Sequence, residues 1–508
     1  ILKRAIYGVD RNPMAVELAK LSLWLHSFTV GAPLSFLDHH LRCGDSLFGE
    51  FVGPVERELH ERYGWVLGGD VAQARQAAAG MARVEELADA DIGEVTSSRE
   101  AFAGVEETTA ALRAFLDLTH AARWLPPSDD AAILARELLF SGNYGNPVRV
   151  AGGDPMRPPS GVQAELRRRG KRFNPAEFLA AASAFVADAR ELAAERRFFH
   201  WEPAFPGVWT DWSSAAPAGG FDAVIGNPPW DRMKLQEVEW FAARVPVIAH
   251  AQRAADRKRL IEQLHRREDP IAADYDRAAK TTETAARVAR TAGVYPLLSG
   301  GDVNIYSLFV ERALRLVRRD GIVGLLVPSG IAADKGASDF FRGISTTGRL
   351  AALLDFENRR PTRGLDPFFP DVDSRFKFCA FVAGGPARAF DHADCAFFKQ
   401  DAIAAEAEAF PLAPEDFAAV NPNTGTAPVF RSRRDAEITL AIYRRLPVLV
   451  DRRGDKPVSL WPVRYFTMFH MTNDSGKFRT AAELERIGAY RVAGQRWSPF
   501  SQRWPATR

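Results

Sequence analysis

The chain has 508 residues, of which 46% are hydrophobic, so it can bury at least one large core and form two or three domains. It contains no run of eighteen or more apolar residues, which argues against a membrane-spanning helix. The three cysteines, Cys43, Cys379 and Cys395, show no C-x-x-C spacing, which argues against a disulfide framework and a zinc site. We therefore expect a globular protein of the reducing cytoplasm.

Charge is unevenly distributed along the chain. The formal net charge is +2, but residues 421–508 contain 16 Lys and Arg against 7 Asp and Glu, which gives this segment +9 and leaves −7 for the rest. Such asymmetry favours contact between the basic segment and a polyanion such as nucleic acid. A solvated basic face is the plain alternative.

The N-terminal stretch predicts a strand followed by a helix. AIYGVD (5–10) has the apolar content of a buried strand, and Asn12-Pro13 then supplies a helix N-cap and a proline at the first helical position. Apolar residues follow at spacings of four and three, which predicts one apolar helix face: Met14, Leu18, Leu21, Leu25 and Phe28. LRCGDSLFG (41–49) predicts a second short strand that ends at Gly44-Asp45.

Strands and helices continue to alternate further along, with two helical interruptions. Residues 51–220 and 231–295 have helical patterns and few other signals. FDAVIG (221–226) predicts a strand buried on both faces. A helix over 304–319, closed by Gly321, precedes strands at 321–328, 350–357 and 376–385. This order predicts an α/β fold with an open, mostly parallel sheet and helices on both faces.

Two acidic residues lie at the predicted carboxyl ends of strands, where open α/β sheets bind their ligands. Asp10 could accept hydrogen bonds from both hydroxyls of a ribose, and a helix-capping or solvent-facing role is the alternative. Asp45 could accept a hydrogen bond from an adenine amine, and a turn-forming role before Ser46 is its alternative.

Asn227-Pro228-Pro229-Trp230 directly follows a predicted strand. An exocyclic amine of a nucleobase is a weak nucleophile because its lone pair is delocalised into the ring. The Asn227 side-chain oxygen and the Pro228 carbonyl could accept its two hydrogens and localise that lone pair, while the two prolines keep both acceptors rigid. Trp230 could stack on the base, which must be flipped out of a duplex to reach this site. A proline-rich turn capped by a buried Trp is the structural alternative.

These motifs resemble those of S-adenosylmethionine-dependent adenine-N6 DNA methyltransferases of restriction-modification and phage-defence (BREX-like) systems. IYGVDRNPMAVELAKLSLWL is similar to their second-strand motif, CGDSLF to the third-strand motif and NPPW to the catalytic motif. DVNIYSLFVERAL and GIVGLLVPSG are similar to the helix and strand after the catalytic loop. The resemblance covers residues 1–49, 221–232 and 302–385, with a looser match at 457–480.

The resemblance implies a Rossmann-like class I methyltransferase sheet with two helical insertions and the start of a C-terminal target-recognition domain. Residues 1–50 would form the cofactor half of the core and 221–390 its catalytic half. The helical insertions would be 51–220 and 231–295, and 391–508 would hold a linker and the start of the target-recognition region.

The resemblance also implies roles for single residues. Asp10 and Asp45 would bind S-adenosylmethionine, and Asn227, Pro228, Pro229 and Trp230 would act on the target adenine of double-stranded DNA without a metal. In the family, a Phe beside a Pro in a later loop packs on the flipped base. Phe369 before Pro370 matches that pattern, Phe368 matches it almost equally, and ordinary core packing is the alternative for both.

The chain departs from the family in one element, a Gly-rich cofactor loop after the first strand. AGGDP (151–155) and LSGGD (298–302) lack a preceding strand, so we expect that strand and loop to lie before Ile1 in a longer protein and this chain to bind the cofactor weakly. Three rivals stay open: methylation of cytosine N4, methylation of a glutamine amide, and a DNA-binding specificity subunit without catalysis. Restriction or defence subunits are the partners that the resemblance implies.

Overall fold

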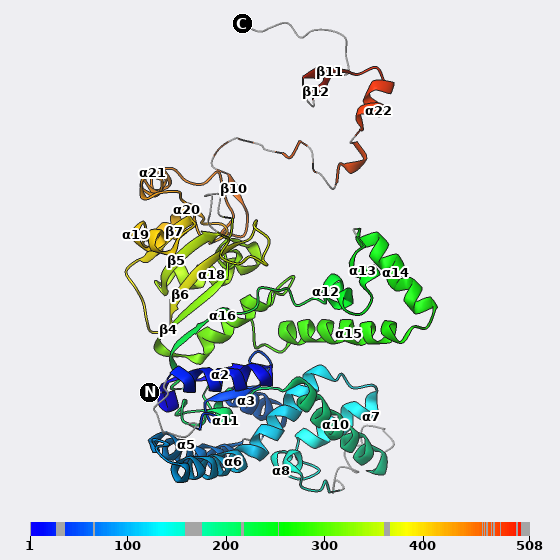
Figure 1. The fold of residues 1–508 in the computed structure, drawn as a ribbon, viewed down its shortest axis with the longest axis vertical. Coiled ribbons are helices and arrows are strands. Elements are labelled where there is room, and N and C mark those ends of the chain that lie inside the picture. Colours follow the sequence, from blue (N-terminus) through cyan, green and yellow to red (C-terminus); the bar gives the residue numbers. More distant parts are fainter. Residues whose placement is uncertain are drawn as a thin grey trace. The chain divides into compact units, whose positions relative to one another are not determined.

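The computed structural model forms two compact units, residues 1–446 and 447–508, and each is described by itself. Most described residues belong to the first unit (Figure 1). The description covers residues 2–26, 36–64, 67–157, 175–214, 218–251, 253–359 and 366–459, and shorter stretches between 461 and 498.

The N-terminal strand and helix are present. β1 (Gly8–Asp10) pairs in parallel with β2 (Leu41–Cys43). α1 (Leu2–Ala5) precedes β1, so the strand is shorter than the sequence predicts. α2 (Pro13–His26) follows, and the Asn12 side chain accepts a hydrogen bond from the Met14 amide at 3.0 Å, which confirms the predicted cap.

The apolar face predicted for α2 points to solvent. Its residues Met14, Leu18, Leu21 and Leu25 are 45–64% exposed, and Phe28 lies outside the described residues. The buried contact of α2 is made by a different face, through Val16, which packs with Leu37 and Leu41 of the β2 segment.

Residues 51–214, within the range predicted as a helical insertion, consist mainly of helices in their described part. Asp91 and Asp129 cap two of its helices with their side chains. Its core also takes in Tyr7 before β1 and Phe221 at the start of β3, so it supports both strands. The helices are α3 (Val52–Tyr63), α4 (Gly68–Arg75), α5 (Ala77–Glu86), α6 (Ile92–Trp124), α7 (Asp130–Phe140), α8 (Pro147–Gly152), α10 (Pro175–Arg196) and α11 (Trp201–Ala204).

The second helical insertion has a small core of its own, built from Phe241, Ile248 and Ile261. Tyr275 packs against this core, with its ring stacked on Phe241. The helices are α12 (Glu237–Ala242), α13 (Pro246–Ala249), α14 (Ala254–Arg266) and α15 (Pro270–Thr291).

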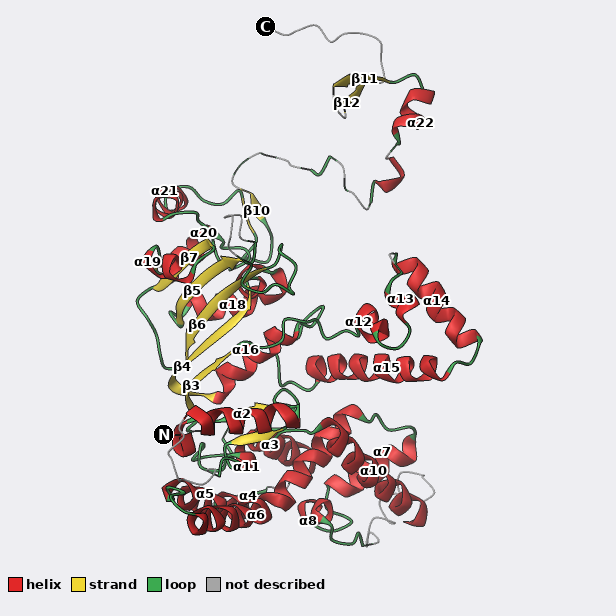
Figure 2. Ribbon diagram, in the orientation of Figure 1, coloured by secondary structure: helices red, strands yellow, loops and turns green. Residues whose placement is uncertain are grey.

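Strands between residues 221 and 412 form a six-stranded sheet (Figure 2). Its strand order is β3-β4-β6-β5-β7-β8. β3 pairs in parallel with β4, and β5 with β7, whereas β6 is antiparallel to both of its neighbours and β8 is antiparallel to β7. The sheet is therefore mixed rather than mostly parallel, because β6 returns from β5 through a loop and lies between β4 and β5. The strands are β3 (Phe221–Gly226), β4 (Val317–Pro328), β5 (Leu350–Glu357), β6 (Lys377–Gly384), β7 (Ala393–Lys399) and β8 (Phe410–Leu412).

Helices cover both faces of this sheet. Alternating residues of β4, such as Val323, Leu325 and Val327, face a core shared with α16, α18, α20 and α21. The opposite face is smaller and is covered by α19 and by aromatic side chains around Phe378. The helices are α16 (Ile305–Leu316), α17 (Gly330–Ala333), α18 (Ser338–Thr346), α19 (Ala402–Ala407), α20 (Pro414–Val420) and α21 (Arg433–Tyr443).

Two local predictions for this sheet were wrong. β3 is an edge strand rather than a strand buried on both faces: it pairs only with β4, and Ile225 is 89% exposed. Gly321 does not end a helix, because α16 ends at Leu316 and β4 already begins at Val317. A Cβ at Gly321 would come within 2.7 Å of the Asp222 carbonyl oxygen, so glycine permits the close approach of β3 and β4.

Residues 391–446, expected to contain a linker, contribute β7, β8, α20 and α21 to the sheet unit. The second unit, residues 447–508, contains short elements: β9 (Val450–Asp451), β10 (Val458–Ser459), α22 (Ala481–Arg486), β11 (Tyr490–Ala493) and β12 (Arg496–Ser498). In the described part of the chain, no helix has the length and hydropathy needed to cross a bilayer.

Candidate active site

The candidate site lies at the end of the six-stranded sheet that is formed by the carboxyl ends of β3, β4 and β5. β4 and β5 both run antiparallel to β6, so they run in the same direction as each other. β3 is parallel to β4 and shares this direction. The carboxyl ends of these three strands therefore meet at the same edge, which is where ligands of open α/β sheets bind. Asn227 follows β3 there, Ser329 follows β4 and Asn358 follows β5.

Two hydrogen-bond acceptors at the end of β3 are unpaired. Asn227 is exposed and Pro228 is buried. Within the part of the chain that the structure describes, neither the Asn227 side chain nor the Pro228 carbonyl has a hydrogen-bond partner. Both prolines lack an amide hydrogen, so this turn presents acceptors and few donors. The arrangement suits a ligand that donates hydrogen bonds.

The loop becomes firmly held after Trp230. The Ile305 amide donates to the Asp231 carbonyl at 2.9 Å, and the Met233 amide donates to the Val303 carbonyl at 2.8 Å. These bonds join the loop to the start of α16, which packs on β4. Asn227 is thus held between a strand on one side and a fixed turn on the other.

Trp230 forms part of an aromatic cluster beside this turn. Its indole N–H donates to the Leu326 carbonyl at 3.3 Å, and its ring stacks on Phe378 with centroids 5.6 Å apart. Phe369 meets Trp230 nearly edge to face, at 4.9 Å and 71°. Trp230 is half-buried, so its position is fixed while part of the ring stays accessible. The structure thus brings together Trp230 and the Phe369 that the sequence singled out.

Phe368, the near-equal candidate, has well-defined neighbours of its own. Its ring packs edge-on against Phe356 at 5.7 Å and against Phe378 at 5.3 Å. Phe356 and Phe378 are both nearly fully buried, which makes these contacts part of the core beneath the cluster. The ring contact with Trp230 therefore favours Phe369.

Ser329 and Asp355 form a second polar pair near this edge. The Ser329 hydroxyl donates to the Asp355 carboxylate, which also accepts from the Phe398 amide at 3.2 Å. Burial raises the pKa of Asp355, while the hydrogen bonds from Ser329 and Phe398 oppose that shift. The pair ties the carboxyl end of β4 to β5.

Asp10 is the last residue of β1 and Asp45 lies two residues after β2, so both are at the carboxyl ends of strands, as predicted. Asp10 is exposed, and one of its oxygens accepts from the Asn12 amide at 2.7 Å. Asp45 is half-buried and accepts from the Leu47 amide at 3.1 Å, with Arg11 at 3.9 Å from its other oxygen. Burial raises the pKa of Asp45, and the Arg11 charge and the backbone N–H groups oppose that shift. Both carboxylates therefore accept hydrogen bonds within the turns that follow β1 and β2.

The Asp45 loop is held from two sides. A Cβ at Gly44 would come within 2.5 Å of the Phe199 ring, so glycine allows residues 197–199 to lie against the loop. The Asp45 amide donates to the Arg197 carbonyl at 2.6 Å. On the other side, the Tyr295 hydroxyl and the Arg312 guanidinium both donate to the Leu47 carbonyl at 2.6 Å.

A shared hydrophobic cluster connects the two halves of the candidate site. Leu47 and Phe48 after β2 pack in the same cluster as Val303 and Met233, which flank the catalytic turn and α16. Among the described residues, no direct contact joins Asp10 or Asp45 to Asn227. The structure therefore places the two groups in neighbouring loops rather than in one bonded cluster.

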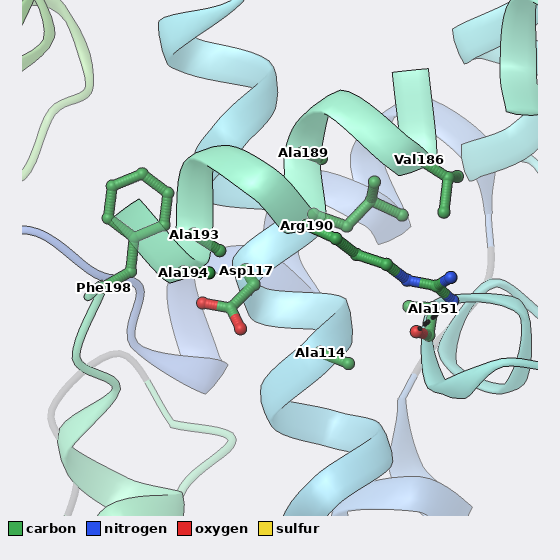
Figure 3. Close-up of a pocket in the computed structure, with 10 residues that line it drawn as sticks. Ala114, Asp117, Ala151, Val186, Ala189, Arg190, Ala193, Ala194 and Phe198 are labelled. Carbon is green, nitrogen blue, oxygen red and sulfur yellow. Dashed lines mark hydrogen bonds between the residues drawn. The ribbon is translucent and has the colours of Figure 1, made fainter. Parts of the chain in front are cut away.

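A cavity lies elsewhere, between α6 and α10 of the helical insertion (Figure 3). It has a volume of about 260 Å³ and its lining includes Ala114, Asp117, Arg190 and Phe198. Its polar groups are already paired: Asp117 binds His200 at 3.0 Å, and Arg190 donates to the Ala151 carbonyl at 3.1 Å. No residue of the candidate site lines it.

Sequence patterns missed several residues that support the site. Asn358, Arg312, Tyr295 and Phe378 come from segments that read as ordinary strand ends or helix faces. The stretch around Arg312, LFVERALRLV, also contains Glu311 and Arg315, so the sequence does not single out Arg312. No local sequence pattern indicates the role of Asn358, because its hydrogen-bond partners, Phe369 and Val372, are 11 and 14 residues further along the chain.

Comparisons with known proteins agree with the motif pattern. Residues 4–254 match the family model described as Eco57I restriction-modification methylase. No curated protein matches the chain. The matched segment contains β1, β2, β3 and the Asn227–Trp230 turn.

Three solved structures align with low similarity. The type IIG restriction endonuclease BpuSI is 14% identical, the alignment covers 65% of this chain and 35% of that chain, and the TM-score is 0.19. A protein from Listeria monocytogenes described as a putative class I S-adenosylmethionine-dependent methyltransferase is 9% identical, with 68% of this chain and 90% of that chain covered and a TM-score of 0.18. A type I restriction-modification methyltransferase subunit from Streptococcus thermophilus is 11% identical, with 85% of this chain and 78% of that chain covered and a TM-score of 0.19.

TM-scores this low support no argument about the site. The aligned part also spans only 35% of the BpuSI chain. The family match has more weight because it includes the strand ends and the catalytic turn. Over residues 4–254, the chain is similar to restriction-modification methylases of the Eco57I family.

Proposed function

We propose that this protein transfers a methyl group from S-adenosylmethionine to the N6 amine of adenine in a specific sequence of double-stranded DNA, as part of a restriction-modification or related phage-defence system. The observation that supports this most directly is the turn after β3. There, the Asn227 side chain and the Pro228 carbonyl are unpaired acceptors beside the Trp230–Phe369 pair. The match of residues 4–254 to a restriction-modification methylase family supports the same chemistry.

The turn suits an aromatic amine as substrate. The two acceptors would each take one amine hydrogen, which localises the nitrogen lone pair and directs it toward an electrophile. Trp230 and Phe369 would hold the face and edge of the base after it leaves the duplex, because stacking contributes about 1 to 3 kcal/mol per base. That gain offsets a flipping cost of a few kcal/mol. As the new N–CH₃ bond forms, the S–CH₃ bond of the sulfonium would break to leave a neutral thioether, and the nitrogen would lose its extra proton to solvent.

The residues present fit the adenosine part of S-adenosylmethionine. Asp10 is exposed at the end of β1 and keeps one carboxylate oxygen without a hydrogen bond in the described part of the chain, so it would accept from ribose hydroxyls. Asp45 would accept from the adenine amine. When bound, the cofactor supplies an electrophilic methyl group.

Product analysis tests the proposal directly. DNA carrying the protein's recognition sequence is treated with the full-length protein and S-adenosylmethionine, digested to nucleosides and analysed by mass spectrometry. The proposal predicts N6-methyladenine. Formation of N4-methylcytosine would show that cytosine, not adenine, is the substrate. Protein methylation without DNA methylation would favour a glutamine amide as the substrate. DNA binding without any methyl transfer would favour a specificity subunit.

A further inference from the structure

Asn358 is a fully buried polar residue directly after β5, and it is bonded to the loop that carries Phe369. Its side chain is 0% exposed. The side-chain oxygen accepts from the Phe369 amide at 3.0 Å, and the side-chain nitrogen donates to the carbonyls of Phe369 and Val372, both at 3.0 Å. One amide group therefore uses its acceptor and both of its donor hydrogens on a single loop.

These bonds fix the main chain of Phe369 on both sides of its Cα. The loop has further internal bonds, from the Val372 amide to the Phe369 carbonyl at 3.2 Å and from the Phe376 amide to the Asp373 carbonyl at 2.9 Å. The backbone amide of Asn358 also donates to the Phe376 carbonyl at 3.3 Å, which holds the far end. With its backbone fixed at both ends, the loop holds the Phe369 ring at 4.9 Å from Trp230.

The pattern requires an asparagine. Aspartate has the same shape but no donors, and it would place an unpaired charge at a site without solvent. Alanine would leave the Phe369 and Val372 backbone groups without their partners, which is costly for buried groups. Glutamine would extend the amide by one methylene in a packed site. Among these residues, only asparagine can make all three hydrogen bonds at this position.

We propose that Asn358 is a positioning residue, which fixes Phe369 against Trp230 and so shapes the aromatic surface that receives the target base. This inference rests on the proposed function, because it assigns that surface to a flipped base. Asn358 itself does not touch the reacting atoms. It acts through the Phe369 backbone.

The positioning claim is tested first without any methyl transfer. Trypsin cleaves after Arg375, which is exposed in the same loop, where the Phe376 amide and carbonyl are both hydrogen bonded. Asn358→Ala should raise the cleavage rate at Arg375 about tenfold or more at temperatures well below the unfolding transition, since release of the loop exposes this bond. An unchanged rate would overturn the positioning role.

Asn421→Ala is the matched control. Asn421 also holds a loop through its side chain, with bonds from its nitrogen to the Thr426 carbonyl at 3.1 Å and to the Thr426 hydroxyl at 3.4 Å, but it lies after α20. Its loop does not contain Arg375, so cleavage there should stay at the wild-type rate. Acceleration by Asn421→Ala as well would indicate general loosening and count against a specific role for Asn358.

A double-mutant cycle with Phe369→Ala then tests the functional part. Alone, Asn358→Ala should lower kcat about 10- to 100-fold with a smaller change in KM, as misplacement of a positioning group does. In the Phe369→Ala background the same change should have little further effect, because the ring it positions is gone. Effects that multiply would overturn the proposal.

The two arms separate this inference from the proposed function. If the wild-type protein methylates no DNA, the proposed function fails, and the base-receiving role of Asn358 fails with it. The trypsin result would still decide whether Asn358 positions the Phe369 loop. If methylation occurs and the cycle is additive, the proposed function stands and the inference about Asn358 falls.

Discussion

The indole ring of Trp230 and the phenyl ring of Phe369 meet nearly edge to face, with centroids 4.9 Å apart and an interplanar angle of 71°. The two residues come from loops that follow different strands, β3 and β5. Phe378 supports both rings, at 5.6 Å from Trp230 and 5.1 Å from Phe369. A rigid aromatic pair beside unpaired acceptors is the arrangement that a planar, hydrogen-donating ligand requires.

The first prediction concerns stacking by Trp230. In DNA with 2-aminopurine at the target position, Trp230→Ala should give brighter emission on binding than the wild type, since the indole quenches a stacked base. Binding should weaken by about 1 to 3 kcal/mol, the value of one stack. A mismatched target should recover part of this loss because its flipping costs less. Fluorescence and binding titrations measure both effects.

Trp240→Ala provides the control for Trp230. Trp240 is also half-buried and packs against Phe241 and Tyr275, but in the second helical insertion. Its truncation should lower the melting temperature and leave the 2-aminopurine signal unchanged. If Trp230→Ala does the same, with no dependence on the target base pair, Trp230 is a structural residue only.

The second prediction concerns the support of the Asp45 loop by Tyr295. Tyr295→Phe removes the hydroxyl that donates to the Leu47 carbonyl at 2.6 Å and accepts from Arg312 at 2.9 Å. The loss of these buried bonds should lower the free energy of unfolding by about 1 to 3 kcal/mol. Tyr443→Phe, at a residue that is 38% exposed, should have no measurable effect in the same denaturant titration. Equal effects of the two variants would contradict this account.

The third prediction is a pH dependence centred on His39. This side chain is 0% exposed, and burial together with the neighbouring His40 lowers the pKa of His39 to about 4 from its ordinary 6.5. The unfolded chain therefore takes up a proton on His39 between pH 6.5 and 4 that the folded chain does not. The contribution of His39 to the free energy of unfolding is therefore fully present above pH 6.5. Up to about 3 kcal/mol of this free energy is lost as the pH falls to 4.

His39→Gln isolates this contribution because glutamine does not titrate. The variant should show a flatter loss of unfolding free energy between pH 6.5 and 4 than the wild type. His26→Gln, at an exposed residue of α2, should keep the wild-type profile. A wild-type slope in His39→Gln would show that other groups, such as Glu85, whose pKa is lowered in the folded chain, dominate the acid sensitivity.

The fourth prediction concerns the basic C-terminal segment. Deletion of residues 447–508 removes 11 Lys and Arg and 5 Asp and Glu, and it leaves the first compact unit whole. If this segment contacts phosphates, DNA binding should weaken and depend less steeply on salt, because fewer counterions are released. Binding isotherms at several salt concentrations give the slope, and an unchanged slope would place the phosphate contacts elsewhere.

Local patterns were sufficient for most elements. The Asn12 cap, α2, the helical insertions and strands β4 to β6 follow from periodicity and capping residues, which act over a few positions. Pairing between strands is not encoded at that range. The insertion of β6 between β4 and β5, and the edge position of β3, depend on contacts between distant segments. The α/β fold was therefore predicted, but the sheet is mixed rather than mostly parallel, and the prediction of a buried β3 was wrong.

The candidate site could be predicted only in part, for the same reason. Asn227 to Trp230 form a contiguous motif that is visible in the sequence, whereas Phe369, with Phe368 as a near-equal candidate, was suggested only by the family resemblance. The roles of these residues stay predictions. Asn358 and Tyr295 act through backbone carbonyls of other loops, and no spacing rule connects a side chain to a backbone group so far along the chain.

Asn227→Ala tests the central claim most directly. Asn227 is exposed and has no hydrogen bond within the described residues, so its truncation should leave folding and DNA affinity within a few fold of the wild type. Methyl transfer to adenine in the full-length protein, measured as N6-methyladenine formed per protein in a single-turnover reaction, should be abolished. Methylation near the wild-type rate in this variant, at equal stability and DNA occupancy, would contradict the proposed role of Asn227 and with it the proposed mechanism.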